Sequence, residues 1–172
     1  ERGDEVYIPD GNFELKARDE ISIVGTQAKT IELFKKLGVP TSSARDALIV
    51  GGGRTSVYLA KQLLEMGIRV KIVERDEERC EELNEMVPKA MIICGDATDK
   101  DLLIEEGLLE TEAFVATTNF DEENIMLALF AKSLSSAKLI TKVHRISYDD
   151  IIDQLDVGSI IYPKFITSES II

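Results

Sequence analysis

Short apolar runs alternate with segments of helical periodicity along most of this chain. The runs are 47–50, 70–73, 90–93, 113–116, 139–143 and 160–161. A strand buried on both faces is typically a continuous apolar run, and strands that alternate with helices form a parallel sheet. The pattern therefore predicts an α/β fold with a doubly wound, Rossmann-like parallel sheet of strand order 3-2-1-4-5-6.

Helix start and stop signals stand between these runs. Asp76 is a good N-cap for a helix to about Val87, and Gly67 is a stop signal for the helix before it. The other signals are a capping box of Thr98 with Asp101, a helical pattern over 121–134, a capping box of Ser147 with Asp150, and a helix start over 163–172. We therefore expect a helix between each pair of successive strands.

The first 38 residues do not follow this pattern. The expected strands and helix, in order, are 6–8, 13–17, 21–24 and 27–37. A piece of this size is too short to bury much surface by itself. Residues 39–45 have the composition of a linker. The expected organisation is a small α+β piece over 1–38, a linker over 39–45 and a Rossmann-like domain over 46–172.

Three glycines follow the first apolar run directly. Gly51 can take the tight turn after the strand, and Gly53 lacks a Cβ, so a pyrophosphate can approach its backbone where the next helix begins. Glu74, 23 residues after Gly51, can accept hydrogen bonds from ribose hydroxyls. Ser56 replaces the third glycine of G-x-G-x-x-G and is small enough to be tolerated. The unit predicts nucleotide binding, and a purely structural glycine turn is the alternative.

Charge and composition exclude several classes of function. The net charge of −12 argues against a surface for nucleic acid or anionic lipid. No apolar run approaches the length that spans a bilayer, and no secretory signal opens the chain. The single histidine cannot make a zinc site. Cys80 and Cys94 have neither metal spacing nor a secretory context, so we expect reduced thiols in the core of a cytosolic protein.

Four short stretches together resemble one family. They are Gly-Gly-Gly-Arg at 51–54, Val-Glu-Arg-Asp at 73–76, Cys-Gly-Asp-Ala-Thr at 94–98 and Asp-Glu-Glu-Asn at 121–124. The set resembles the RCK (KTN) nucleotide-binding domain, and most closely the TrkA-type regulatory subunits of potassium uptake systems. Residues 1–38 resemble the later part of the small RCK C-terminal domain, so the chain would span the middle of a tandem protein.

The resemblance implies a cytoplasmic regulatory subunit and no catalysis. Such domains bind NAD(H), ATP, ADP or AMP, form dimers or higher homo-oligomers, and gate a potassium-translocating membrane subunit to which they are peripheral. The residues that match the cofactor site are Gly51, Gly53, Arg54, Thr55, Ser56, Glu74, Arg75, Asp96, Ala97, Thr117 and Asn119. In that family the helix corresponding to 163–172 crosses to another subunit. The sequence does not choose between NAD(H) and the adenosine phosphates.

Several alternatives stay open. Arg54 is either a phosphate contact or a solvated arginine, and Asp96 either meets the adenine or caps a turn. His144 and Arg145 end the fifth expected strand near the cleft. Three roles stay open for them: contact with a ligand, contact with a partner, or packing in the interior. An NAD-dependent oxidoreductase is disfavoured because Tyr148 has no lysine four residues later. A dimerisation domain without a ligand is the third class of function.

Overall fold

The computed structural model describes residues 2, 5–19, 21–23, 25–38, 44–145, 155 and 157–163. The chain divides into two units, 1–43 and 44–172, and each is described by itself. The predicted capping box at Ser147 and Asp150, and all but the first residue of the predicted helix start over 163–172, lie outside the described residues.

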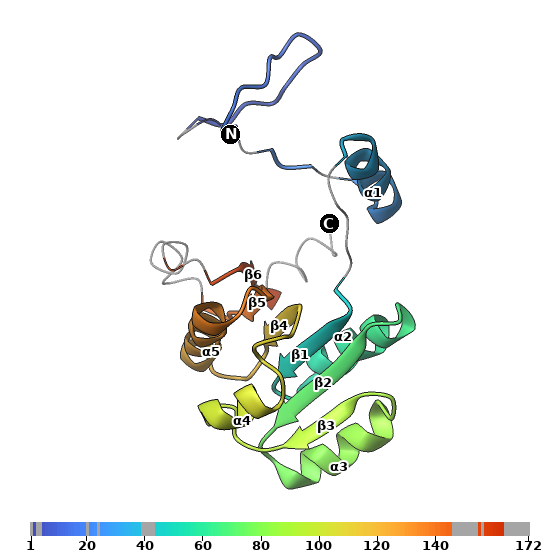
Figure 1. The fold of residues 1–172 in the computed structure, drawn as a ribbon, viewed down its shortest axis with the longest axis vertical. Helices are drawn as coiled ribbons and strands as arrows, with labels where there is room; N and C mark the ends of the chain where they lie inside the picture. The colour runs from blue at the N-terminus through green and yellow to red at the C-terminus, as the bar shows by residue number, and fades with distance from the viewer. Residues whose placement is uncertain are drawn as a thin grey trace. The chain divides into compact units, whose positions relative to one another are not determined.

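The second unit is built on a six-stranded sheet in which every neighbouring pair is parallel (Figure 1). The strands are β1 (Asp46–Val50), β2 (Arg69–Glu74), β3 (Met91–Cys94), β4 (Ala113–Ala116), β5 (Lys138–Lys142) and β6 (Ser159–Ile161). Their order is β3-β2-β1-β4-β5-β6, so the predicted order 3-2-1-4-5-6 is confirmed. The order reverses between β1 and β4, which is where open α/β sheets usually bind ligands.

Helices cover both faces of this sheet. They are α2 (Arg54–Glu65), α3 (Glu77–Met86), α4 (Lys100–Glu105) and α5 (Asp121–Leu134). On one face, α2 and α3 pack their apolar sides on Ile49 and Ile72. On the other face, α4 and α5 pack on Leu48 and Val73. Each fully buried side chain of this size contributes about 1.5–3 kcal/mol, so the two clusters hold the strand ends in place.

The helix ends confirm some of the predicted signals and correct one. The Asp76 carboxylate accepts from the Arg79 N–H at 2.8 Å, and Gly67 follows α2 with a φ of 80°. The capping box of Thr98 and Asp101 is wrong, because Asp99 is the N-cap of α4. Thr98 instead donates its N–H and its hydroxyl to Asp96, so its hydroxyl is already bound outside the helix.

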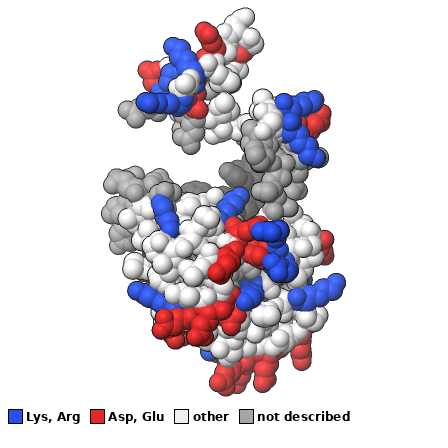
Figure 2. Space-filling view, in the orientation of Figure 1, with Lys and Arg blue, Asp and Glu red and all other residues white. Residues whose placement is uncertain are grey.

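Acidic side chains gather at the lower end of the view in Figure 2, where α3 lies in Figure 1. The exposed acids of α3 are Glu77, Glu78, Glu81, Glu82 and Glu85. Among the described residues, no helix has the length and the apolar character that crossing a membrane requires.

The first unit contains α1 (Gln27–Lys36), which confirms the predicted helix. The predicted strands over 6–8, 13–17 and 21–24 are wrong, since the described residues of these ranges contain no strand. β-prone residues form a stable strand only when one face is covered. Here Val6, Ile8 and Ile21 are largely exposed.

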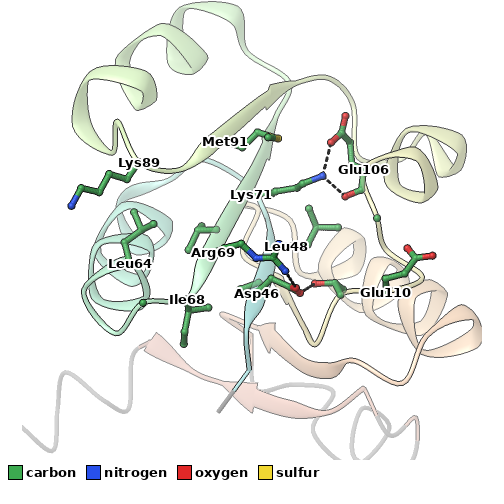
Figure 3. A pocket seen from close by; sticks show the side chains of 15 residues that line it. Asp46, Leu48, Leu64, Ile68, Arg69, Lys71, Lys89, Met91, Glu106 and Glu110 are labelled. Atoms are coloured by element: carbon green, nitrogen blue, oxygen red, sulfur yellow. Dashed lines mark hydrogen bonds and ion pairs between the residues drawn. The ribbon is translucent and has the colours of Figure 1, made fainter. Parts of the chain in front are cut away.

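A pocket of about 580 Å³ lies at the amino ends of β1, β2 and β3. Figure 3 shows two ion pairs in it: Arg69 reaches Asp46, and Lys71 reaches Glu106. Its apolar side chains include Leu48, Leu64, Ile68 and Met91. This pocket lies at the end of the sheet opposite the glycine loop.

Candidate functional site

The glycine loop between β1 and α2 has three distinct positions. Gly51 has a φ of 94°, and a Cβ there would lie 2.9 Å from the Thr118 backbone nitrogen. A Cβ on Gly52 would lie 2.5 Å from the Leu83 side chain. At Gly53, the N-cap of α2, a Cβ would meet nothing within 4 Å. The protein itself therefore requires the first two glycines, while the third borders open space.

Glu74 at the end of β2 holds this loop through its carboxylate. One oxygen accepts from the Gly52 N–H at 2.6 Å, and the other accepts from the Asp76 N–H at 3.0 Å. Each carboxylate oxygen can accept a second hydrogen bond, so Glu74 keeps capacity for ligand hydroxyls. The predicted acid is thus placed beside the glycine loop and fixed by two backbone donors.

Two residues of this wall were not predicted from the sequence. Gly52 is the middle glycine of the run, and its carbonyl accepts from the Arg79 side chain at 2.8 Å. Arg79 is three residues after the N-cap Asp76 and also pairs with Glu82. The one sequence feature that could have indicated this contact is the position of Arg79 in the first turn of the helix that follows β2.

Ser56 supports the loop from behind. Its side chain is fully buried, and its hydroxyl lies 2.9 Å from the Thr117 hydroxyl. Thr117 in turn donates to the Val50 carbonyl at 2.9 Å, so the two hydroxyls tie α2 to the ends of β1 and β4. The serine is therefore an internal hydrogen-bonding residue as well as a small one.

The loop after β4 is held by α5 and β5. The Asn124 side chain accepts from the Thr118 N–H at 2.8 Å and donates to the Lys142 carbonyl at 2.9 Å. The buried Lys142 ammonium donates to the Thr117 carbonyl at 2.9 Å. Burial lowers the pKa of Lys142, and the nearby Asp121 carboxylate opposes that shift. The sequence assigned no structural role to either polar residue: Asn124 follows three acids, and Lys142 lies in an otherwise largely apolar run.

Asp121 joins the start of α5 to the end of β5. Its carboxylate accepts from the backbone N–H groups of His144 and Arg145 and contacts the His144 ring nitrogen Nδ1 at 2.9 Å. Burial acts to raise the pKa of Asp121, but these hydrogen bonds outweigh it and hold the pKa below its ordinary value. His144 is thus bound to Asp121, and Arg145 contacts Glu122 at 3.6 Å.

The far wall of the cleft comes from the loops after β2, β3 and β4. One oxygen of Asp96 accepts both hydrogen bonds from Thr98, which lower the pKa of Asp96. Asp96 therefore caps a turn, and its second oxygen accepts no hydrogen bond from the described residues. Across the mouth, the Arg75 guanidinium carbon lies 5.8 Å from the centre of the Phe120 ring. Phe120 is exposed and was not predicted.

These loops enclose a cleft of about 220 Å³ at the carboxyl ends of the strands. Eight of the predicted site residues line it, namely Gly51, Gly53, Glu74, Arg75, Asp96, Ala97, Thr117 and Asn119. Arg54 and Thr55 are exposed in the first turn of α2, outside the lining, and Ser56 lies behind the loop. Common ligand pockets hold about 300–1,000 Å³, so an extended ligand would lie along this groove, partly outside it.

The polar groups of the cleft suit an anionic, hydroxyl-bearing ligand. The first turn of α2 leaves backbone N–H groups without helical acceptors, and its dipole favours negative charge. Glu74 supplies acceptors for hydroxyls at the neighbouring strand end. Among the described residues, no group of three histidines, cysteines or acids is placed to hold a metal ion.

Residues 47–163 match the family model described as the TrkA-N domain. The chain is 33% identical over 164 residues to the Trk system potassium uptake protein TrkA of Vibrio alginolyticus, covering 95% of this chain and 36% of that protein. It is 33% identical over 166 residues to the TrkA homolog of Archaeoglobus fulgidus, covering 96% and 38%. The chain therefore spans less than half the length of these curated relatives.

Solved structures share the fold at low sequence identity. The TrkA-N domain of the inner membrane protein ybaL from Escherichia coli superposes with a TM-score of 0.66 at 18% identity, covering 76% of this chain and 96% of that one. The GsuK channel bound to NAD gives a TM-score of 0.61 at 17% identity, covering 78% and 25%. At this level of identity the likeness shows a shared fold.

Proposed function

Because the chain belongs to the TrkA-N domain family, we propose that its cleft binds an adenine nucleotide and that this binding regulates potassium transport. The observation that carries the proposal is the open space over Gly53 at the start of α2. A glycine that the protein's own packing does not require is explained by a ligand that approaches its backbone. NAD(H), ATP, ADP and AMP all carry phosphates suited to that place.

The phosphates would lie over Gly53 and the first turn of α2. Backbone N–H groups and the helix dipole stabilise an anion there. The exposed Arg54 side chain makes no ion pair with the described residues, so it is free to add a charge-assisted contact. Thr55 would contribute its N–H and hydroxyl on the same turn.

The ribose and base would lie toward the ends of β2 and β3. Glu74 would accept from the ribose hydroxyls, and the second oxygen of Asp96 would accept from the exocyclic amine of adenine. Arg75 would stack on the adenine face, and Thr117 and Asn119 would border the second half of a dinucleotide. A 2′-phosphate would meet the Glu74 charge, so we expect NAD(H) to bind more tightly than NADP(H).

The proposed role is that of a cytoplasmic regulatory subunit, not an enzyme. Relatives that this chain resembles are named as potassium uptake proteins, and one solved neighbour is a channel bound to NAD. The proposed partners are a potassium-translocating membrane subunit, to which the protein is peripheral, and a second copy of the chain. A nucleotide that binds one arrangement of the dimer tenfold better supplies about 1.4 kcal/mol of coupling to gating.

Calorimetric titration with NADH, NADPH, ATP, ADP and AMP tests the binding directly. We expect saturable binding of at least one adenosine nucleotide without a 2′-phosphate, with NADH preferred over NADPH. Sedimentation with and without the bound nucleotide tests the dimer and its change of shape. Absence of binding by every nucleotide would contradict the proposal, and turnover of NADH with a substrate would favour an oxidoreductase.

A further inference from the structure

The two cysteines of the chain lie on the same side of the sheet, next to residues that line the cleft. Side chains alternate along β3, so Cys94 is on the same face as Ile92, which packs in the cluster of α2 and α3. Cys80 lies in the first half of α3 and faces the sheet with Leu83. Its sulfur lies 3.3 Å from the carbonyl oxygen of Glu74, the residue that pairs with Cys94 in the sheet.

The two thiols differ in exposure. Cys80 is 6% exposed, whereas Cys94 is exposed at the end of the edge strand β3. The expectation that both lie in the core is therefore correct for Cys80 and wrong for Cys94. Burial raises the pKa of Cys80 to about 12, and the neighbouring Cys94 thiol adds to the shift. Cys94 is thus the thiol that a solution reagent reaches first.

We propose that Cys80 and Cys94 are a modification site. Oxidation by a low-molecular-weight disulfide joins the two cysteines in a reversible intramolecular disulfide bond, and this bond weakens nucleotide binding in the adjacent cleft. The second clause rests on the proposed function of the cleft. The first clause concerns the thiols alone and can be tested without any nucleotide.

The chemistry needs only the two thiols and the oxidant. The Cys94 thiolate attacks one sulfur of the small disulfide and releases one thiol, which takes the proton of Cys94. The Cys80 sulfur then attacks the Cys94 sulfur of this mixed disulfide and releases the second thiol, which takes the proton of Cys80. The two cysteines lose two electrons, and the small disulfide is reduced to two thiols.

The bond would act on the cleft because both cysteines adjoin its walls. Cys94 directly precedes Gly95 and Asp96, which line the cleft. Cys80 directly follows Arg79, which holds the Gly52 carbonyl. A disulfide sulfur carries no hydrogen, so Cys80 would lose its hydrogen bond to the Glu74 carbonyl, and the S–S bond of about 2.05 Å would replace that contact. The start of α3 and the turn after β3 would then shift toward each other and displace groups on both sides of the ligand.

The test treats the chain with oxidised glutathione and follows its intact mass, its free thiols and its affinity for NADH. We expect the mass to fall by two hydrogen atoms and no free thiol to be detected, whether the protein is folded or denatured. NADH binding should become about fivefold weaker, and dithiothreitol should reverse this loss. Cys94→Ser should gain no disulfide and should keep its NADH affinity after treatment. Cys80→Ala should carry only a glutathione adduct at Cys94.

Each other outcome overturns a stated clause. A wild-type chain that keeps both thiols, or carries glutathione on Cys94 without closing the bond, overturns the modification site. A closed disulfide with unchanged NADH affinity overturns its effect on the cleft. If the reduced chain binds no nucleotide, the proposed function of the cleft fails, while the mass measurement still decides whether the disulfide forms.

Discussion

The two ends of the parallel sheet carry two hollows of opposite character. The amino-end pocket measures about 580 Å³, and four of its charged side chains form the ion pairs Arg69–Asp46 and Lys71–Glu106. The carboxyl-end cleft measures about 220 Å³, and its loops are tied by side chains that bind backbone groups. We propose the smaller cleft as the ligand site, because the N-terminus of α2 borders it and the space over Gly53 is open. A choice made on volume alone would favour the other end of the sheet.

The largest expected effect follows from filling the space over Gly53. We expect Gly53→Val to weaken NADH binding by roughly a hundredfold or more, about 2.8 kcal/mol, because its branched side chain occupies the phosphate position. Stability should fall by only about 1 kcal/mol, since valine is a poor N-cap but its Cβ would have no atom within 4 Å. Calorimetry and urea unfolding measure the two quantities.

The matched control is Met91→Val at the amino-end pocket, which should leave the NADH affinity unchanged. If the folded Gly53→Val protein bound NADH with wild-type affinity, the carboxyl-end cleft would not be the site.

A second contrast compares Glu74→Gln with Glu106→Gln. The amide that Glu74→Gln introduces can accept at only one of its two terminal atoms, so one of the two backbone N–H groups loses its acceptor at a cost of about 1–3 kcal/mol. We expect NADH binding to weaken about tenfold and the preference over NADPH to shrink, because the like charge is gone. Calorimetric titration of each variant with both cofactors measures the two effects.

Glu106→Gln breaks only the partly exposed pair with Lys71, worth about 0–1 kcal/mol. Its NADH titration should match the wild type. Equal losses of affinity in the two variants would mean that Glu74 has no special role.

A smaller effect is expected behind the glycine loop. Ser56→Ala removes the buried hydrogen bond to Thr117 and should cost about 0.5–1.5 kcal/mol of stability. NADH affinity should fall only about threefold, less than 1 kcal/mol, because Thr117 keeps its bond to Val50. At the other end, Thr111→Val should cost similar stability without any change in affinity. A larger affinity loss in Thr111→Val would show that the two ends are coupled.

The smallest effect on binding is expected at Asp46. Burial acts to raise the pKa of Asp46, but hydrogen bonds from Glu112, Thr111 and Arg69 hold the pKa below its ordinary value. The ionised form is therefore favoured by folding, and its contribution is present above about pH 4 and lost as the pH falls through the folded pKa. Asp46→Asn should be about 1 kcal/mol less stable at pH 7.

Urea unfolding at several pH values should show the gap between wild type and Asp46→Asn shrinking below about pH 4. NADH affinity at pH 7 should be unchanged. A stability gap that stays constant into acid would contradict the assigned role of the carboxylate.

The centre of the sheet was predictable because β1 and β4 are buried on both faces and therefore appear as continuous apolar runs. The same reasoning failed at 6–8 and 21–24, where the described β-prone side chains are exposed. It also failed at Thr98, because Asp96 two residues earlier binds its hydroxyl and leaves Asp99 as the cap. Local sequence propensity contains information neither on whether a segment is covered by another layer nor on which nearby group binds a capping side chain.

In the cleft, the glycines and the acid were predictable because their spacing along the chain is fixed by the strand–helix–strand unit. The requirement for glycine at Gly52 was not, since it arises from contacts with Leu83 and Glu74 on other elements. Lys142 and Arg79 were missed for the same reason: each acts by donating to a backbone carbonyl of a different loop. Such partners are set by the packed fold and leave no periodic signal.

The tie between Glu74 and its two backbone donors also has an entropic consequence. A free glutamate side chain can lose up to about 2 kcal/mol of rotamer entropy when it is fixed. In this protein folding itself has already placed the Glu74 carboxylate through Gly52 and Asp76. A ligand that binds at the β2 tip would therefore not have to fix the Glu74 side chain. Less of the free energy of each new hydrogen bond would be lost to side-chain entropy, and more would contribute to affinity.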